Sequence, residues 1–406
     1  MEEEYVFSGD NTYGEGQTSR ESRKRLVLFY SNIPTLNLFT NQLKQGFLEL
    51  GYEIYELNLS KDDGFGPFLK YVQENPVTAM IAFNNSFFGT TLSSGENMCE
   101  ALGIPSINIL VDHPYWYHDE ILMRTPSNGI VLCVDRNHMN YVHRFYPNIS
   151  CNGFLPLGGF SGYSTHKPIS DRKTEVLYAG SLSTNRIPHD FSGWDFPAKQ
   201  ILEHLITHTE DTIEAVIEQE LRQAGVILPD EELRKFISSC ATLDNIVSSY
   251  YREKVVSSVA KAGIPLELYG NGWEVFDWVK LPNVHYGGCV SPEEILLMME
   301  DSKIILNSMP WFRDGSHDRV FNAMMCGAVA VSETSKYLEE VLPADTWVSF
   351  DLSYASLADL PHRIKELLAD EERMQQIASA GYELAASEHT WKARALELHR
   401  DLLSQL

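Results

Sequence analysis

Short apolar runs alternate with segments of helical periodicity along this chain, and no other feature limits its fold as strongly. The runs of the first stretch cover residues 25–30, 53–57, 79–83, 106–111, 130–134 and 152–157. They are almost continuously apolar, which is typical of strands that are buried on both faces of a sheet. Because strands separated by helices pair in parallel, the chain is predicted to have an α/β fold with a helix-covered parallel sheet.

The alternation starts again at residue 175, which predicts a second domain of the same kind. Its apolar runs cover residues 175–183, 266–270, 284–287, 304–307, 328–331 and 347–350. Between about 185 and 263 the sequence shows helical periodicity and little strand signal, so we expect a helical insertion there. Two doubly wound domains in series place the default ligand site in a cleft between them, at the carboxyl ends of their strands.

Four segments follow from these patterns, and 406 residues suffice for two domains that each bury a core. They are a disordered or loose arm over 1–24, an N-terminal domain over 25–165, a C-terminal domain over 170–385 that includes the insertion, and a C-terminal helix over 386–406 that could pack back on the first domain. The arm is polar and rich in Gly, Ser and Glu, so it has few apolar anchors.

The composition argues against several classes of protein. Lys and Arg number 32 against 56 Asp and Glu, and the resulting net charge of −24 argues against broad binding to nucleic acid or anionic membranes. No apolar run reaches the roughly 18 residues of a transmembrane segment, and the acidic N-terminus lacks the signature of a signal peptide. The six cysteines include no CxxC pair, so we expect reduced thiols and a cytoplasmic protein.

The segment 314–331 carries the strongest signal for a binding site. Gly315 and Ser316 stand where a helix is predicted to begin, with His317 and Arg319 in its first turn. A helix N-terminus offers unpaired N–H groups and the positive end of the helix dipole, and an arginine adds a fixed cation with several donors. Together these features suit a diphosphate. In the alternative interpretation, Arg319 pairs with a neighbouring aspartate on the surface.

Three stretches of the second domain resemble GT-B glycosyltransferases of the CgeB-like, or spore-maturation-protein-like, group, which is related to glycosyltransferase family 4. They are the strand and turn 266–273 (LELYGNGW), the strand 284–288 followed by Ser291-Pro292-Glu293-Glu294 and a helix, and the segment 317–327 with H-x-R, an aromatic residue two positions on and a closing glycine. The resemblance covers about 175–400. Over 25–160 it is mainly architectural, helped by Asp112-His113-Pro114.

The resemblance implies a GT-B fold of two Rossmann-like domains, a nucleotide-sugar donor held mostly by the C-terminal domain and an acceptor held mostly by the N-terminal domain. It also implies transfer without an essential metal and without a cofactor beyond the nucleotide-sugar substrate. Asn322 stands where many retaining relatives have a glutamate that holds the donor ribose, and an amide bonds a hydroxyl without the strength of a charge. Ser31-Asn32-Ile33-Pro34 stands where many relatives have a glycine pair.

Two turns after strands of the second domain are further candidates for donor contacts. Gly180-Ser181 could face a phosphate with its backbone and hydroxyl, or could be a simple strand-to-helix turn. The turn Gly270-Asn271-Gly272-Trp273 has two glycines that permit a close approach of the backbone. Trp273 or Tyr269 could line the pocket of a nucleotide base, and the alternative is a tight turn with a core tryptophan.

Asp112 and His113 end a predicted strand of the first domain. A carboxylate or imidazole there could act as general base on an acceptor hydroxyl or orient the sugar, and the alternative is a helix cap or loop contact. The neighbouring Tyr115 and Trp116 could stack on an acceptor sugar, with ordinary packing as the alternative.

The sequence therefore predicts a hexosyltransferase-like enzyme that moves a sugar from a nucleotide-diphosphate donor to a hydroxyl of a glycan, a protein or a small molecule. It contains no cluster with metal-ligand spacing, no Walker-type phosphate loop, no GxSxG elbow and no dinucleotide fingerprint. Two alternatives stay open, which are a nucleotide-sugar epimerase of the same fold and a non-catalytic nucleotide-binding or scaffold protein.

Overall fold

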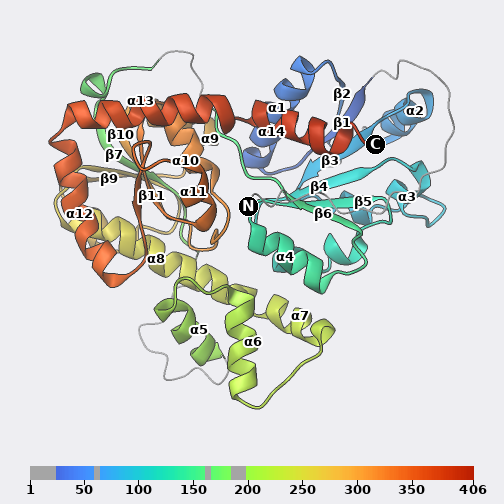
Figure 1. The fold of residues 1–406 in the computed structure, drawn as a ribbon, viewed down its shortest axis with the longest axis horizontal. Coiled ribbons are helices and arrows are strands. Elements are labelled where there is room, and N and C mark those ends of the chain that lie inside the picture. Colours follow the sequence, from blue (N-terminus) through green and yellow to red (C-terminus); the bar gives the residue numbers. More distant parts are fainter. Residues whose placement is uncertain (1–23, 59–64, 161–165, 184–197) are drawn as a thin grey trace. The chain divides into compact units, whose positions relative to one another are not determined.

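The chain folds into two compact units in the computed structural model (Figure 1). The N-terminal unit consists of the chain up to Pro156 together with Trp391–Leu406, and the C-terminal unit consists of Leu157–Thr390. The structure describes residues 24–58, 65–160, 166–183 and 198–406. The predicted arm therefore lies, up to residue 23, outside the described residues.

The N-terminal unit is built on a six-stranded sheet in which all neighbouring strands are parallel. The strands, in the order β2-β1-β3-β4-β5-β6, are β1 (Arg25–Tyr30), β2 (Glu53–Asn58), β3 (Ala79–Phe83), β4 (Ser106–Leu110), β5 (Gly129–Cys133) and β6 (Cys151–Phe154). Every residue of β3, β4 and β5 is buried, as their continuous apolar runs predict.

Helices and 3₁₀ turns connect these strands. They are α1 (Pro34–Glu49), α2 (Phe65–Glu74), α3 (Met98–Leu102) and α4 (Arg136–Phe145), with η1 (Ser86–Gly89), η2 (Pro114–Tyr117) and η3 (Leu122–Arg124). Helix α1 begins at a proline and buries the apolar face that its periodicity predicts, which includes Leu36, Phe39, Leu43 and Phe47.

The end of the chain packs on helix α1 and strand β3. Helix α14 (Trp391–Leu398), followed by the π-helical turn η6 (His399–Leu403), places the ring of Trp391 4.9 Å from Phe39 and 5.5 Å from Phe83. Gly46 permits this approach, because a Cβ there would lie 2.6 Å from the Cβ of Ala395. Residues 391–406 therefore belong to the N-terminal unit and add Trp391, Ala395 and Leu398 to its core.

The C-terminal unit is built on a second six-stranded parallel sheet. Its strands, in the order β12-β11-β10-β7-β8-β9, are β7 (Thr174–Ala179), β8 (Leu266–Tyr269), β9 (Val284–Gly288), β10 (Ser302–Asn307), β11 (Val329–Glu333) and β12 (Val348–Phe350). The chain adds β8 and β9 on one side of β7 and then crosses to add β10 on the other side. The topological switch point, where ligands of open α/β sheets bind, thus lies between β7 and β10.

The other helices of this unit, apart from those of the insertion, connect its strands or follow the last of them. They are α9 (Pro292–Glu300), α10 (Asp318–Met325), α11 (Lys336–Val341), α12 (Tyr354–Leu368) and α13 (Glu371–Glu388), with the 3₁₀ turns η4 (Ile169–Asp171) and η5 (Asp277–Lys280). Ser291 and Glu294 form a capping box at the start of α9. Helix α10 begins at Asp318, not at Gly315 and Ser316 as predicted, because the His317 side chain caps it by accepting from the Arg319 N–H at 3.2 Å.

Four helices make up the described part of the insertion predicted over 185–263. They are α5 (Ala198–Thr207), α6 (Ile213–Gln223), α7 (Asp230–Ser239) and α8 (Ala241–Lys261), and residues 184–197 lie outside the described residues. Figure 1 shows α5, α6 and α7 gathered at one end of the long helix α8. Because α8 also contacts α12, it joins the insertion to the body of the C-terminal unit.

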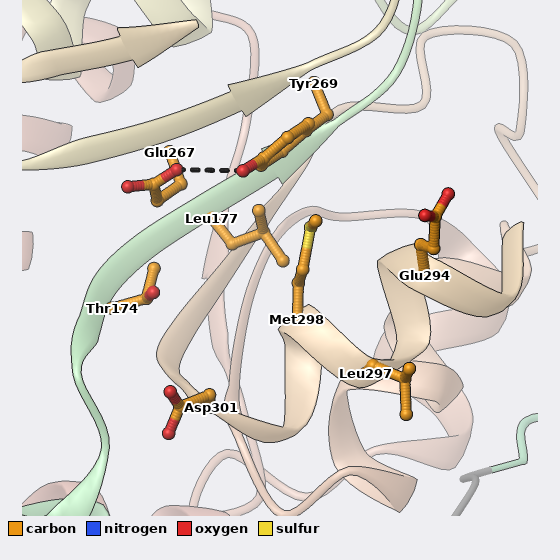
Figure 2. Close-up of a pocket in the computed structure, with 8 residues that line it drawn as sticks. All are labelled: Thr174, Leu177, Glu267, Tyr269, Glu294, Leu297, Met298 and Asp301. Atoms are coloured by element: carbon orange, nitrogen blue, oxygen red, sulfur yellow. Dashed lines mark hydrogen bonds between the residues drawn. The ribbon is translucent and has the colours of Figure 1, made fainter. Parts of the chain in front are cut away.

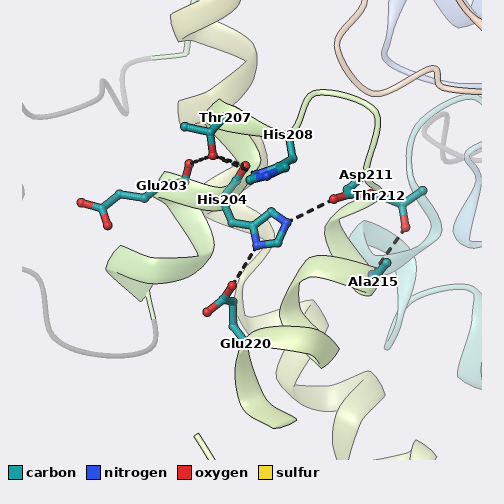
Figure 3. Close-up of polar contacts among 8 residues, drawn as sticks. All are labelled: Glu203, His204, Thr207, His208, Asp211, Thr212, Ala215 and Glu220. Atoms are coloured by element: carbon teal, nitrogen blue, oxygen red, sulfur yellow. Dashed lines mark hydrogen bonds and ion pairs between the residues drawn. The ribbon is translucent and has the colours of Figure 1, made fainter. Parts of the chain in front are cut away.

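His204 on α5 contacts two carboxylates through its ring nitrogens, one on α6 and one in the turn between α5 and α6 (Figure 3). Its Nδ1 lies 2.8 Å from the carboxylate of Glu220 on α6, and its Nε2 lies 3.1 Å from that of Asp211. The His204 side chain is only 10% exposed. Burial alone would lower the pKa of His204, but the two carboxylates outweigh burial and raise the pKa above its ordinary value.

We expect the contact between α5 and α6 to weaken as the pH rises. Because the pKa of His204 is higher in the folded than in the unfolded chain, the stabilisation is fully present below the unfolded value of 6.5 and is lost as the pH rises through the folded value. Hydrogen exchange of the α5 and α6 amides, corrected for intrinsic rates, should show this loss, and His204→Gln should remove it. His208→Gln is the matched control, because His208 bonds the hydroxyl of Thr207 instead of a carboxylate. Protection in the wild type that does not change with pH would contradict the prediction.

Candidate functional site

The candidate site lies at the carboxyl edge of the C-terminal sheet, at the switch point between β7 and β10. Strand β7 is followed by Gly180 and Ser181, and β10 ends at Asn307. The side chain of Arg319, in the first turn of α10, reaches both strand ends. Residues that the sequence analysis assigned separately to one ligand are thus brought together.

Arg319 is a buried cation with no carboxylate in ion-pairing distance among the described residues. It is 9% exposed, and its Nη1 donates to Oδ1 of Asn307 at 2.5 Å. Its guanidinium lies 5.7 Å from the centre of the Tyr178 ring, and a Cβ on Gly180 would lie 3.4 Å from its Nη2. Burial lowers the pKa of Arg319, although an arginine stays charged. Because an isolated buried charge is costly, an anion is strongly favoured at this point.

Polar side chains around the start of α10 hold one another. Asn322 Nδ2 donates to Oδ2 of Asp318 at 2.8 Å. Oδ1 of Asn322 accepts from the N–H of Phe160 at 3.1 Å. The amide predicted to hold a ribose is therefore bonded within the protein on both sides. A glutamate at 322 could not donate to Asp318 and would be repelled by it, which is a physical reason for the amide.

Burial also acts on the residue that caps α10. Loss of water is the main cause that lowers the pKa of His317, and the charge of Arg319 lowers it further. The imidazole therefore adds no positive charge at neutral pH, and Arg319 is the cation of this helix N-terminus.

The turn after β8 is locked onto the loop after β7. Gly270 has φ +121°, and a Cβ there would lie 2.4 Å from the carbonyl oxygen of Gly180. The N–H of Asn271 donates to Oγ of Ser181 at 3.0 Å, and the N–H of Leu182 donates to the carbonyl of Asn271 at 2.9 Å. Gly272 also has positive φ. Only glycine suits position 270, so the two predicted turns form one backbone unit.

Trp273 and Tyr269 differ in how far they could serve a nucleotide base. Trp273 has no exposed surface, and its indole N–H donates to the carbonyl of Gly180 at 2.8 Å. Trp273 is therefore the core tryptophan of the alternative interpretation, and its hydrogen bond helps to fix the loop after β7. Tyr269 donates its hydroxyl to Glu267 at 3.1 Å, and burial followed by the charge of Glu267 raises its pKa.

A pocket of about 300 Å³ lies between β7, β8 and α9 and has Tyr269 in its wall (Figure 2). The lining residues are Thr174, Leu177, Glu267, Tyr269, Glu294, Leu297, Met298 and Asp301. Its carboxylates already have partners, since Glu267 bonds His285, Glu294 caps its own helix and Asp301 pairs with Lys167 at 2.6 Å. Acidic walls repel a diphosphate, so this pocket does not fit the anionic part of a donor.

Gly315 and Ser316 lie buried in the segment that enters α10. The Ser335 hydroxyl donates to the carbonyl of Gly315 at 2.6 Å, and the Ser316 hydroxyl donates to the carbonyl of His317 at 3.1 Å. These contacts fix the path of the backbone into the helix, and the Ser316 hydroxyl is turned toward the protein backbone.

Glu333, at the end of β11, is a buried carboxylate that the sequence analysis missed. It is 2% exposed, accepts from the N–H of Met309 at 2.8 Å and lies 3.4 Å from Nη1 of Arg313. Burial raises its pKa, although the charge of Arg313 opposes the shift. The available signal was an acidic residue that ends an apolar strand at the same sheet edge as Asn307.

In the N-terminal unit, the predicted residue Asp112 is an exposed carboxylate held by two donors. Nδ2 of Asn84 lies 2.9 Å from Oδ2 of Asp112, and the hydroxyl of Tyr117 lies 2.5 Å from the same atom. Asn84 has φ +42° and accepts from the N–H of Val111 at 2.9 Å. A non-glycine residue in this conformation is uncommon and such residues cluster at functional sites, so Asn84 is a further candidate. Its signal was the Asn84-Asn85 pair that follows β3.

The residues next to Asp112 have different surroundings. His113 is buried and caps η2, with Nδ1 accepting from the N–H of Tyr115 at 3.3 Å and its ring stacked on Tyr115 at 3.9 Å. Burial lowers the pKa of His113 well below its ordinary value. His113 and Tyr115 thus take the capping and packing roles of the alternative interpretation. Trp116 is 39% exposed and offers an aromatic face.

Three properties of the described residues concern metal ligands, membrane-spanning helices and cysteines. No group of three or more His, Cys, Asp or Glu side chains among them could hold a metal ion. No helix within the described ranges has the length and apolar character needed to cross a membrane. All six cysteines are thiols.

Comparisons with known proteins find a family match for one segment and a shared fold for the chain. Residues 252–400 match a family described as glycosyl transferase-like, and this segment contains both the Gly270 turn and Arg319. Sucrose-phosphate synthase from Thermosynechococcus elongatus has a TM-score of 0.55 at 13% identity, over 95% of this chain and 100% of that one. The chain has a GT-B glycosyltransferase fold.

Two further structures share the GT-B fold. HepE from Anabaena, solved in complex with UDP and glucose, has a TM-score of 0.52 at 11% identity, over 94% of this chain and 100% of that one. A glycosyltransferase from Rickettsia africae has a TM-score of 0.52 at 9% identity, over 95% of this chain and 100% of that one. No sequence among curated proteins matches the chain. The GT-B likeness thus comes from the fold, and the glycosyl transferase-like match is to residues 252–400.

Proposed function

We propose that this GT-B protein is a glycosyltransferase that moves a hexose-like sugar from a nucleoside-diphosphate donor to a hydroxyl acceptor without a metal ion. The observation that carries the proposal is Arg319, a buried cation with no carboxylate partner among the described residues. It lies at the switch point of the sheet, within the glycosyl transferase-like segment. The fold and the charge therefore both support an anionic ligand at this place.

In this proposal the donor's diphosphate binds the guanidinium of Arg319 beside the N-terminus of α10. When the bond from the sugar to the diphosphate breaks, negative charge grows on the diphosphate oxygens. A fixed guanidinium and a helix N-terminus stabilise that charge without having to reorganise. The chain's own cation thus takes the part that a metal ion plays in other transferases. HepE was solved with UDP and glucose, which supports UDP-sugars as the first donors to test.

For the acceptor we propose the surface around Asp112 and Trp116 in the N-terminal unit. Asn84 and Tyr117 orient the Asp112 carboxylate, which could then accept a hydroxyl proton or hold the sugar. The exposed Trp116 ring offers a stacking face. We also propose that the enzyme works in the cytoplasm, since all six cysteines are thiols.

Asp112→Asn should lower the rate of sugar transfer and leave nucleotide affinity unchanged. The amide keeps the size of the side chain but cannot act as a base, and it lies in the unit that does not contain Arg319. The turnover number and the dissociation constant of the nucleotide, measured on the same preparation, check this result. Full turnover by the variant would remove Asp112 from the proposal.

Thermal stabilisation by UDP, GDP, dTDP, CMP and their sugars tests the donor site first. A ligand at 100 times its dissociation constant adds about 2.7 kcal/mol of stability, so one nucleotide family should raise the unfolding midpoint visibly. Turnover of that donor, with and without added acceptors, then distinguishes a glycosyltransferase from an epimerase and from a non-catalytic protein. A changed sugar released from the donor alone would indicate an epimerase, and binding without turnover would indicate a non-catalytic protein. No response to any nucleotide would overturn the proposal.

A further inference from the structure

We propose that Arg252, on helix α8, is a second cation of the donor site and binds the donor's diphosphate together with Arg319. The inference rests on the proposed function and deepens it, because it makes the helical insertion part of the donor site. Arg252 lies on α8, the long helix beside which α5, α6 and α7 are gathered (Figure 1). No sequence motif pointed to Arg252.

Two arginines converge on adjacent residues of the loop after β7. Nη1 of Arg252 donates to the carbonyl of Ser181 at 2.8 Å. Ser181 directly follows Gly180, and the guanidinium of Arg319 lies against Gly180. One arginine therefore reaches the loop from α8 and the other from α10. Helix α8 holds the same loop a second time, since Oγ of Ser249 accepts from the N–H of Ser183 at 3.1 Å.

Arg252 resembles Arg319 in lacking a counter-charge. No carboxylate among the described residues lies within ion-pairing distance of its guanidinium. Its Nε is buried and has no hydrogen-bond partner in the described part of the chain. In a chain of net charge −24, two such cations on one loop are unexpected unless an anion joins them. A buried N–H without an acceptor is likewise costly, and a phosphate oxygen is a suitable acceptor.

The charge of Arg252 lowers the pKa values of two residues at the start of α10. Burial is the main cause that lowers the pKa of Arg319, and Arg252 lowers it further. The same holds for His317, where burial comes first and Arg319 and Arg252 add to it. The acidic neighbour Glu333 is already bonded to Arg313 and to the backbone of Met309. A diphosphate, with several negative oxygens, would relieve the mutual repulsion of the two arginines.

Inorganic pyrophosphate is the probe for this inference, because it presents the diphosphate without a base or sugar. Its dissociation constant is measured by calorimetry on the full chain for the wild type, Arg252→Gln and Arg319→Ala, at two salt concentrations. Arg252→Gln should weaken pyrophosphate binding about tenfold, which corresponds to about 1.4 kcal/mol. Pyrophosphate binding to Arg252→Gln should also depend less on the salt concentration, because the contact between pyrophosphate and the charge of Arg252 is lost. Arg222→Gln is the matched control, an arginine of the same insertion that pairs with Glu218 on the surface of α6.

The outcomes separate the inference from the proposed function. If Arg319→Ala loses pyrophosphate binding while Arg252→Gln keeps wild-type affinity, Arg252 is no ligand and the proposed function stands. If Arg252→Gln weakens pyrophosphate binding but leaves its salt dependence unchanged, Arg252 acts only by holding the Ser181 loop in place, and the inference is overturned. If neither pyrophosphate nor any nucleoside diphosphate binds the wild type, the inference falls together with the proposed function. The unfolding midpoint of each variant without ligand shows that the comparison is made on folded protein.

Discussion

Arg319→Ala should weaken the binding of a nucleoside diphosphate at least tenfold while the chain stays folded. One hydrogen bond to a charged group contributes about 1.5–3 kcal/mol, and a guanidinium can make two such bonds to a diphosphate. The substitution leaves the buried Oδ1 of Asn307 without its donor, but it also removes a buried charge that has no carboxylate partner among the described residues, so the chain should stay folded. Calorimetric titration with the nucleotide that stabilises the wild type checks the affinity, and thermal unfolding checks the fold.

A second buried arginine shows what a structural role looks like in this unit. Arg172 donates to the backbone carbonyls of Lys167, Ser302 and Cys326 at 2.8–3.1 Å, so its donors are used by the protein itself. Arg319 donates to one amide oxygen and otherwise faces a tyrosine ring and a glycine. Arg319→Lys should keep part of the affinity, since it keeps the charge but loses the forked geometry. Nucleotide affinity in Arg319→Ala equal to that of the wild type would remove the assignment.

The sequence predicted the sheets well because the signal for a strand buried on both faces is local. The run at residues 79–83 is apolar at every position and forms β3, and the run at 304–307 ends β10. The helix after β10 was placed too early because Gly315 and Ser316 look like a helix start. The cap is instead a histidine, and its hydrogen bond depends on a side-chain conformation that no pattern encodes.

The site was predictable in its glycines and its arginine, and not in its partners. Gly270 and Arg319 stand in recognisable turns, so their place at the sheet edge follows from the strand order. Arg252 lies on a helix of the insertion and reaches this edge only through tertiary packing, whereas Glu333 ends an apolar strand at the edge but stands in no recognisable motif. The sequence also could not predict the partners of Asn322. Its amide bonds both Asp318, on the same helix, and Phe160, whose segment meets α10 only in the folded chain.

Gly270→Ala should destabilise the C-terminal unit by about 2–6 kcal/mol and impair nucleotide binding. The backbone at 270 has φ +121°, a conformation that costs an alanine about 1–3 kcal/mol. The new Cβ would also lie 2.4 Å from the carbonyl oxygen of Gly180, and relieving such a contact by a backbone shift costs about 1–3 kcal/mol more. Scanning calorimetry should show a lower unfolding midpoint for the C-terminal unit.

Gly263→Ala separates the two causes. Gly263 also has positive φ, at +76°, but a Cβ there would meet nothing within 4 Å. It should therefore cost only the backbone term, about 1 kcal/mol, and leave nucleotide affinity unchanged. The difference between the two variants measures the contact of the β8 turn with the loop after β7. Gly180 follows β7, and the guanidinium of Arg319 lies against it. A displacement of the Gly180 backbone therefore also displaces the proposed phosphate site. Equal destabilisation by the two variants, with nucleotide affinity intact in both, would show that the turns are not coupled in this way.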